Sequence, residues 1–410
     1  MIEFLLGAAF YLTVFSVTPG IGTNMQTTAI LVMAAAAAYA LLTNRVNAVR
    51  PSATEIVMYL AGASFVILAV FGDADSVFLS IAFLAAIISI SIVSRSISLE
   101  VILDICARVA LLDIATVIVF DHQQALIALN SGMGGGGGIV RFMPLHFHPD
   151  LTGYVFGSSV ILMARRALIA SRRIERTLML LGAFIGCVFV LAASARSSII
   201  AMFFASAVAI VLEYGARRFF SNRWVRFGGV SVAVFCALFA SRVGPYFANM
   251  LELASDSRGV GWNGNGRTDL WARGIFTLFN DPSLFIFGGG FRSSNFEAIG
   301  FQTESSYISI LLDSGAFLGT AIILVFWYAP IKALRLVPPA GRRSNSLILL
   351  ASFMTFLIVE STFNRYLLAL GNPASLMSLV VLFGLSMQEN AASSTVDAPK
   401  LFREPQHTFK

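Results

Sequence analysis

Long apolar stretches alternate with short polar segments along most of the chain. No stretch alternates strictly between apolar and polar residues, so the pattern is typical of helices rather than of barrel strands. We therefore predict an all-α, polytopic membrane protein with about twelve transmembrane helices. The stretches are residues 2–17, 26–42, 54–71, 77–93, 101–120, 151–164, 177–193, 197–212, 227–243, 304–329, 346–362 and 373–387.

The composition supports a membrane protein. Apolar residues make up 57% of the 410 positions and charged residues 12%, whereas a soluble domain has about 25% charged residues. The three cysteines, Cys106, Cys187 and Cys236, fall in apolar stretches, which indicates packing rather than disulfides or metal ligation. The net charge of +6 is explained more simply by basic cytoplasmic loops than by nucleic acid, so no nucleic-acid partner is expected.

Basic residues gather in alternate loops. Roughly 19 of the 28 Lys and Arg lie near residues 45–50, 95, 165–176, 217–226 and 332–343 and in the C-terminal tail. Loops rich in Lys and Arg face the cytoplasm, so we predict that both termini are cytoplasmic.

Two long segments lie on the opposite side. Residues 121–150 contain the five-glycine run Gly134–Gly138, which indicates a mobile loop without an assigned role. Residues 244–303 form a loop too long for a plain connector, and apolar spacing over 268–279 predicts a helix within it. Residues 1–387 are therefore read as one integral membrane domain, and 388–410 as a polar, disordered cytoplasmic tail.

The usual motifs of soluble enzymes are absent from the sequence. It has neither a nucleotide-binding Walker A loop nor a dinucleotide fingerprint, and its four histidines do not form a convincing metal set. We expect no cofactor and no metal, with His146 and His148 as the alternative if a metal binds. Asp104 and Arg108 form an i, i+4 pair inside an apolar stretch, where charges are either functional or structurally paired.

Arginines and carboxylates recur on the predicted extracytoplasmic side. An arginine fork binds phosphate with two hydrogen bonds and stays charged at any working pH, and a neighbouring carboxylate can act as a general base. Such a set suits a lipid-linked diphosphate. The residues are Arg196, Arg267, Arg292, Glu304, Glu360 and Arg365.

Each of these signals has a plainer alternative. Arg196 could be a helix-end arginine that extends to the membrane interface. Glu304 could cap the first turn of the stretch that it opens, because a helix N-terminus favours an acid. The run Gly288–Gly290 could be a turn without a ligand.

The order of these motifs resembles the bacterial O-antigen polymerase and O-antigen ligase superfamily, which includes exopolysaccharide polymerases. The resemblance covers roughly residues 190–330 and depends on short phrases in a fixed order. They are Ser194-Ala195-Arg196-Ser197, Gly266-Arg267-Thr268-Asp269-Leu270-Trp271, Asp281-Pro282, Gly288-Gly289-Gly290-Phe291, Glu304-Ser305-Ser306-Tyr307 and Leu311-Leu312-Asp313-Ser314-Gly315.

The resemblance implies a metal-independent glycosyltransferase of the bacterial inner membrane, whose donor is a glycan on undecaprenyl diphosphate at the outer face. Arg196 and Arg267 would hold the diphosphate and neutralise the leaving group, and Glu304 would activate the acceptor hydroxyl. Ligases of this family usually have a histidine at that place, so Glu304 favours a polymerase. The remaining substrate-binding candidates are Asp269, Arg292, Tyr307, Glu360 and Arg365.

We therefore predict a polysaccharide polymerase that joins undecaprenyl-diphosphate-linked repeat units, in O-antigen or exopolysaccharide biosynthesis. Its expected partners are a lipid-linked oligosaccharide donor and acceptor, membrane lipids, a chain-length regulator and a flippase. One alternative is a ligase that transfers the glycan to lipid A core. Another is a transporter of lipid-linked sugar, for which broken helices and an inverted repeat are expected; the sequence predicts neither.

Overall fold

Helices are the only regular structure in the part of the chain that can be described. The computed structural model describes residues 1–47, 50–70, 74–131, 140–214, 267–292, 302–335 and 345–396, and these contain no strand. The predicted all-α class is confirmed. The ninth apolar stretch at 227–243, the Gly134–Gly138 run and the first part of the long loop, 244–266, lie outside the described residues.

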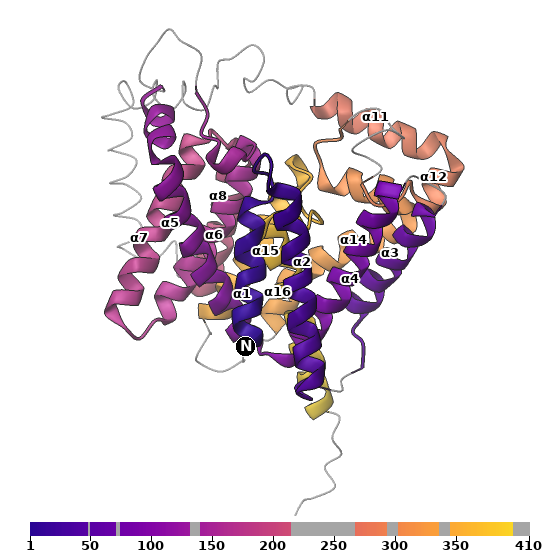
Figure 1. Cartoon of the computed structure of the whole chain (residues 1–410), viewed down its shortest axis with the longest axis horizontal. Coiled ribbons are helices and arrows are strands. Elements are labelled where there is room, and N and C mark those ends of the chain that lie inside the picture. The colour runs from indigo at the N-terminus through magenta and orange to yellow at the C-terminus, as the bar shows by residue number, and fades with distance from the viewer. Residues whose placement is uncertain are drawn as a thin grey trace, which may run out of the picture.

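Figure 1 shows the described helices in chain order. Up to residue 214 they are α1 (Ile2–Leu12), η1 (Thr13–Phe15), α2 (Gly22–Leu42), α3 (Ala53–Ala69), α4 (Ala74–Ser96), α5 (Leu99–Ser131), η2 (Pro144–His146), α6 (Pro149–Ile169), α7 (Arg173–Ala192) and α8 (Arg196–Tyr214). From residue 267 they are α11 (Arg267–Asn280), α12 (Pro282–Phe287), α14 (Ser306–Arg335), α15 (Asn345–Phe363) and α16 (Pro373–Val396).

Four described helices are long and apolar enough to cross a membrane. They are α2, α4 over Ser76–Ser96, α7 and α14, and five shorter apolar helices accompany them. Large apolar side chains point outward on several of these helices, with Phe4 73%, Phe184 67% and Phe317 71% exposed. Exposed aromatic side chains of this size suit a lipid environment. The structure thus supports a membrane protein, whereas the number of about twelve crossings stays a prediction.

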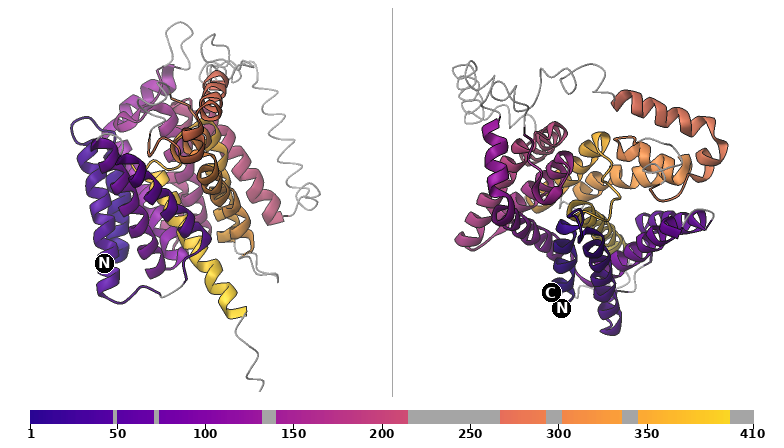
Figure 2. Two further views of the ribbon diagram at one scale, coloured as in Figure 1. Left: turned by 90° about the vertical axis from the view of Figure 1, so that its right-hand side faces the viewer. Right: turned by 45° about the horizontal axis from the view of Figure 1, so that its top comes forward.

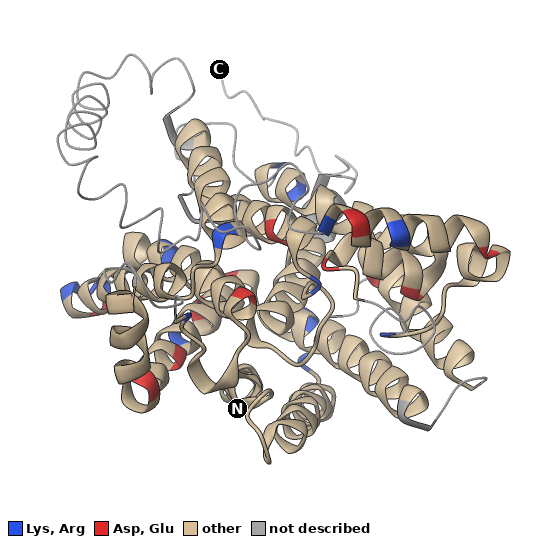
Figure 3. Ribbon diagram, turned by 90° about the horizontal axis from the view of Figure 1, so that it is seen from above, with Lys and Arg blue, Asp and Glu red and all other residues tan. Residues whose placement is uncertain are grey.

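The two ends of the bundle differ. The start of α1 and the end of α16 lie at one end, and α11 and α12 lie at the other (Figures 1 and 2). The basic loops predict the cytoplasm at the first end. Seen from the α11 end, the ribbon has few charged positions (Figure 3).

Two sequence predictions need correction at the predicted cytoplasmic end. The polar tail does not begin at 388, because α16 continues to Val396. Arg108 is exposed, and the described ion pairs do not include one between Arg108 and Asp104. Asp104 Oδ2 instead lies 2.6 Å from Arg166 Nη1, and Arg166 Nη2 lies 2.7 Å from Glu175 Oε1. These ion pairs join α5, α6 and α7.

The helix α14 is broken near its beginning, which the apolar pattern did not predict. Gly315 has φ +76° and ψ 167°, outside the helical region. The segment after α12 contacts this break: the N–H groups of Gly289 and Gly290 donate to the carbonyls of Leu312 and Asp313 at 2.8 and 2.9 Å. The Gly288–Gly290 run therefore attaches the α11–α12 hairpin to α14.

Two glycines make this contact possible. A Cβ atom on Gly315 would lie 2.5 Å from the Ile286 carbonyl oxygen, and one on Gly288 would collide with the Asp313 carbonyl. Gly288 also has φ +78°, which residues with a side chain rarely adopt. The backbones touch directly, so α12 is held against the first turns of α14.

Candidate functional site

A sharp turn between α7 and α8 presents Arg196. Ser194 has φ +52°, and its carbonyl accepts a hydrogen bond from the Arg196 N–H at 3.1 Å. The turn packs on α6 at Gly153, where any Cβ atom would collide with Ser198 and Ala195. The phrase Ser194-Ala195-Arg196-Ser197 is thus a tight joint between two helices, with Arg196 as the first residue of α8.

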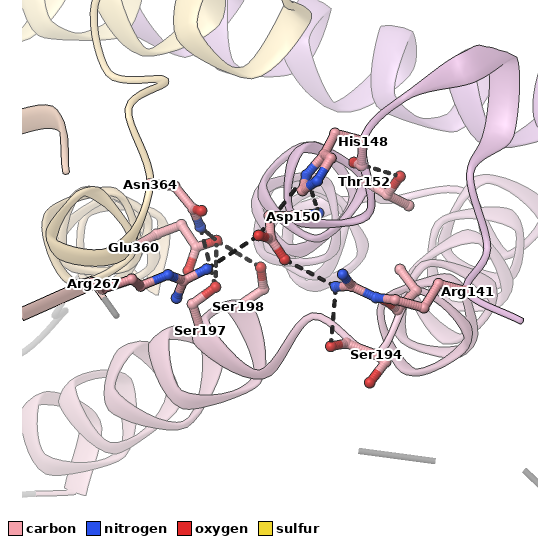
Figure 4. A network of polar contacts seen from close by, with 11 residues as sticks. Arg141, His148, Asp150, Thr152, Ser194, Ser197, Ser198, Arg267, Glu360 and Asn364 are labelled. Atoms are coloured by element: carbon pink, nitrogen blue, oxygen red, sulfur yellow. Dashed lines mark hydrogen bonds and ion pairs between the residues drawn. The ribbon is translucent and has the colours of Figure 1, made fainter. Parts of the chain in front are cut away.

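Asp150, at the start of α6, lies between two arginines (Figure 4). Its Oδ1 is 2.9 Å from Arg141 Nη2, and its Oδ2 is 3.2 Å from Arg267 Nη2. His148 Nδ1 is 3.8 Å from Oδ2. We call these four residues the Asp150 cluster. It ties Arg267, at the start of α11, to the beginning of α6.

Arg141 secures this cluster to the α7–α8 turn. Its Nε donates to the Ala193 carbonyl at 2.9 Å and its Nη2 to the Ser194 carbonyl at 3.4 Å. Burial of Asp150 would raise the pKa of its carboxyl, but Arg141, then His148 and Arg267, lower it below its usual value overall. Because its pKa is lowered, the Asp150 carboxylate is ionised at neutral pH. Asp150 lies just before the predicted span at 151–164.

A second network surrounds Glu360, on the last turn of α15. The Glu360 side chain is fully buried, and its Oε1 accepts from Ser197 at 3.2 Å, Ser198 at 2.7 Å and Asn364 Nδ2 at 2.6 Å. Its Oε2 has no hydrogen-bond partner among the described residues. Figure 4 places this network beside the Asp150 cluster, and the two carboxylates are within electrostatic range.

A cleft opens where the α12–α14 joint meets the segment between α15 and α16. Five polar side chains line it together with apolar ones: Arg292, Ser306, Ser309, Asp313 and Arg365. We call it the arginine cleft. The Arg292 N–H donates to Asp313 Oδ2 at 3.2 Å, and Arg292 itself has φ +62°. Burial lowers the pKa of Arg292, Asp313 raises it, and the nearby charge of Arg365 lowers it further.

Glu304 lies just before α14 in a left-handed conformation, φ +52°. It is half-buried, and α14 begins two residues later, at Ser306, with no acidic residue in its first turn. No described hydrogen bond joins a helix N–H to its carboxylate, so the capping alternative is not supported. A carboxyl-bearing residue held in this uncommon backbone conformation needs support from its surroundings and is a functional candidate.

The structure brings some predicted residues together and leaves others apart. Arg267 and Glu360 lie side by side (Figure 4). Arg196 begins α8 directly before Ser197, which contacts Glu360, whereas Arg292 and Arg365 share the arginine cleft. Asp269 is exposed on α11, away from both groups of contacts. The Tyr307 hydroxyl donates to the Ile358 carbonyl at 2.6 Å, which fits a residue that joins α14 to α15 rather than one that binds substrate.

Sequence reasoning missed the residues that hold Arg267 and Glu360 in place. These are Arg141, Asp150, Ser197, Ser198 and Asn364. The one available signal was the charged pair Arg141 and Asp150 within an otherwise uncharged segment that leads into an apolar stretch. His146 and His148 are close in sequence, but the described residues hold no group of three or more His, Cys, Asp or Glu placed to bind a metal ion.

Comparisons with known proteins add no assignment. The chain matches no protein-family model, and no curated protein is significantly similar to it in sequence. The family resemblance therefore stays a prediction that depends on the order of the motifs.

Proposed function

We propose that this protein is a polysaccharide polymerase that joins undecaprenyl-diphosphate-linked repeat units at the outer face of the bacterial inner membrane. The observation that carries the proposal is the placement of Arg267. Asp150 holds it at 3.2 Å, and the carbonyls of the turn that presents Arg196 hold Arg141, the other partner of Asp150. The turn that carries Arg196 is thus joined to the start of α11, which carries Arg267, through Arg141 and Asp150.

The proposed reaction is a glycosyl transfer. A hydroxyl oxygen of the incoming repeat unit forms a bond to the anomeric carbon of the growing chain. The bond between that carbon and the diphosphate oxygen breaks, undecaprenyl diphosphate leaves with the bonding electron pair, and the hydroxyl proton passes to a base. The leaving group gains negative charge, which fixed positive groups stabilise.

The arginines are suited to the leaving group. A guanidinium has five N–H donors in a planar fork, and Arg267 uses Nη2 toward Asp150. A diphosphate can therefore bind to the same fork while Asp150 fixes its direction. The Arg267 side chain is 28% exposed, which leaves it accessible from the α11 end.

Glu304 is the proposed base. It is half-buried and lies two residues before Ser306, which lines the arginine cleft and donates to the Asn364 carbonyl. Glu360 is less suited, because it is buried and three donors already hold one of its oxygens.

The ligase and the transporter remain the alternatives. A ligase would use the same donor chemistry and differ in its acceptor. Broken helices at the middle of the membrane are expected of transporters, and the break in α14 was not predicted from the sequence. The break lies beside α12, at the end of the bundle where α11 lies, rather than in the middle of the helix, so it supports a positioned hairpin more than a transport site.

The test is polymerisation in vitro, with purified protein and a synthetic lipid-linked repeat unit. Glu304→Gln keeps the shape but loses the base, and we expect the initial rate to fall about 10²- to 10⁴-fold. Arg267→Lys keeps the charge but loses the fork and is expected to fail. Asp281→Asn, an exposed acid whose described contacts are with Ser283 and Leu284 of its own turn, is the control and should retain the wild-type rate.

Three results would contradict the proposal. If wild-type protein yields no polymer but transfers glycan to lipid A core, the ligase is correct. If it only moves the lipid across a vesicle membrane, the transporter is correct. A Glu304→Gln rate within a few-fold of wild type would remove Glu304 from the mechanism.

A further inference from the structure

The arginine cleft brings together two guanidinium groups from distant parts of the sequence. Arg292 follows the glycine run after α12, and Arg365 lies between α15 and α16. Asp313 is the one carboxylate among the described residues that line the cleft, and one of its oxygens already accepts the Arg292 backbone N–H at 3.2 Å. The lining therefore has one excess positive charge.

The two arginines are held close together in a half-buried place. Burial lowers the pKa of Arg292, Asp313 opposes this, and the nearby charge of Arg365 adds a smaller lowering. An anion between the two would relieve this repulsion and accept hydrogen bonds from both forks. A phosphate group fits this requirement, because its oxygens match the guanidinium geometry.

Apolar side chains also line the cleft. Phe291, Ile310 and Leu368 form one part of the wall, and Phe291 packs on Phe83 at 4.6 Å between ring centroids. A free phosphate gains nothing from such a wall, whereas a phosphate that carries a prenyl chain buries part of that chain against it. The lining therefore favours a lipid-linked phosphate.

One short segment joins this cleft to the region of Arg196 and Arg267. The Asn364 side chain donates to Glu360 at 2.6 Å and Ser197 at 3.1 Å. The Asn364 carbonyl accepts from the N–H and the hydroxyl of Ser306, at 2.9 and 2.6 Å, and Ser306 lines the cleft. Arg365 is the next residue. The two groups of arginines are thus neighbours that share one stretch of backbone.

We infer that the arginine cleft is a second lipid-phosphate site, which binds the lipid-linked acceptor while Arg196 and Arg267 bind the donor. The inference rests on the proposed function. A polymerase needs two lipid-diphosphate substrates at once, so a second site for such a lipid is expected of it. Glu304 precedes Ser306 of the cleft lining by two residues, which is compatible with a base that acts on an acceptor bound there.

The test measures how many equivalents of lipid the protein binds when no reaction takes place. Purified protein in detergent is titrated with undecaprenyl diphosphate by calorimetry, and wild type is expected to bind two equivalents. The double variants Arg292→Gln/Arg365→Gln and Arg196→Gln/Arg267→Gln should each bind one. Arg172→Gln/Arg335→Gln removes two exposed charges at the other end of the bundle and should still bind two.

A second arm separates lipid from free phosphate. Inorganic pyrophosphate should bind the cleft at least about tenfold more weakly than the lipid, since it gains no apolar burial. If the double variant at the cleft does not fold, as judged by its melting curve, the single change Arg365→Lys keeps the charge and should weaken one of the two sites about tenfold by removing the fork.

The outcomes of this binding test can be distinguished from those of the polymerisation test. One equivalent in wild type, two equivalents in the cleft variant, or equal binding of pyrophosphate and lipid would each overturn the inference. Two equivalents that fall to one in the cleft variant would support the cleft even if no polymer were formed. Polymer formation with a single binding equivalent would support the function and refute the cleft.

Discussion

Replacing Asp150 by Asn tests whether this residue positions Arg267. The change keeps the size of the side chain and one carbonyl oxygen but removes the negative charge between Arg141 and Arg267. The new amide group also presents N–H donors to a guanidinium that has only donors. At least one of the two contacts must therefore be lost.

The magnitude follows from the exposure of the three side chains, 12% for Asp150, 11% for Arg141 and 28% for Arg267. Exposed ion pairs contribute about 0 to 1 kcal/mol, and breaking a buried pair costs about 3 to 5 kcal/mol. These contacts lie between the two limits, so we expect a cost of about 2 kcal/mol, equivalent to about thirtyfold in an equilibrium or a rate.

Two measurements show how much of this free-energy cost lowers the stability of the protein and how much lowers its activity. Loss of the Arg141 contact should lower the melting temperature of the purified protein, and Arg141→Gln should lower it similarly. Loss of the Arg267 contact should instead slow polymerisation of a lipid-linked repeat unit. Asp281→Asn is the control, because that exposed carboxylate contacts only Ser283 and the Leu284 N–H within its own turn.

A double-mutant cycle gives the decisive result. If Asp150 positions Arg267, the rate losses of Asp150→Asn and Arg267→Gln should overlap by at least about 1 kcal/mol. Losses that add to within about 0.5 kcal/mol would show two independent residues and refute the positioning role.

The pH dependence has a definite sign. The pKa of Asp150 is lower in the folded protein than its ordinary value, so its ion pairs stabilise the folded state at neutral pH and lose that effect as pH falls through the folded pKa. The difference in stability between wild type and Asp150→Asn should be constant down to about pH 5 and shrink below about pH 4.

Two further predictions concern topology and the α14 break. A reporter fused after Gly264 should be extracytoplasmic and one fused after Arg217 cytoplasmic, since the basic loops set the orientation; the opposite labelling would invert the assignment of sides. Gly315→Ala should destabilise the protein by about 2 kcal/mol or more, because its Cβ would lie 2.5 Å from the Ile286 carbonyl at φ +76°. Gly20→Ala, at φ +82° with nothing within 4 Å, keeps the strain without the collision; an equal loss in both variants would show that the contact is unimportant.

Apolar length was sufficient to predict most of the helices. A span ends where the run of apolar residues ends, and this can be read from the neighbouring residues in the sequence alone. The helix over 268–279 was also predictable, because one side of α11 is apolar and its residues Gly274 and Leu278 are buried. The end of α16 was missed because the polar residues after 387 were taken as a tail, whereas the helix continues through them.

The contacts of the site were not predictable from local pattern. Arg267 and Asp150 are 117 residues apart, and many carboxylates could in principle have paired with that arginine. The break at Gly315 depends on the backbone of residues 286–288, so no property of the α14 sequence alone specifies it. The order of motifs supplied candidate residues, but only the fold shows that Arg292 and Arg365 line a cleft separate from the contacts of Arg267.

The joint between Gly288 and Gly315 has a consequence for how substrate preference can change. The joint is made of main-chain atoms, so it has no side-chain chemistry with which to distinguish one sugar from another. If the proposed polymerase function holds, glycan preference can change at the rim of the arginine cleft while this joint is kept. Efforts to redirect the protein to new repeat units should therefore leave both glycines unchanged and vary side chains such as Leu368 and Ser309, which line the cleft.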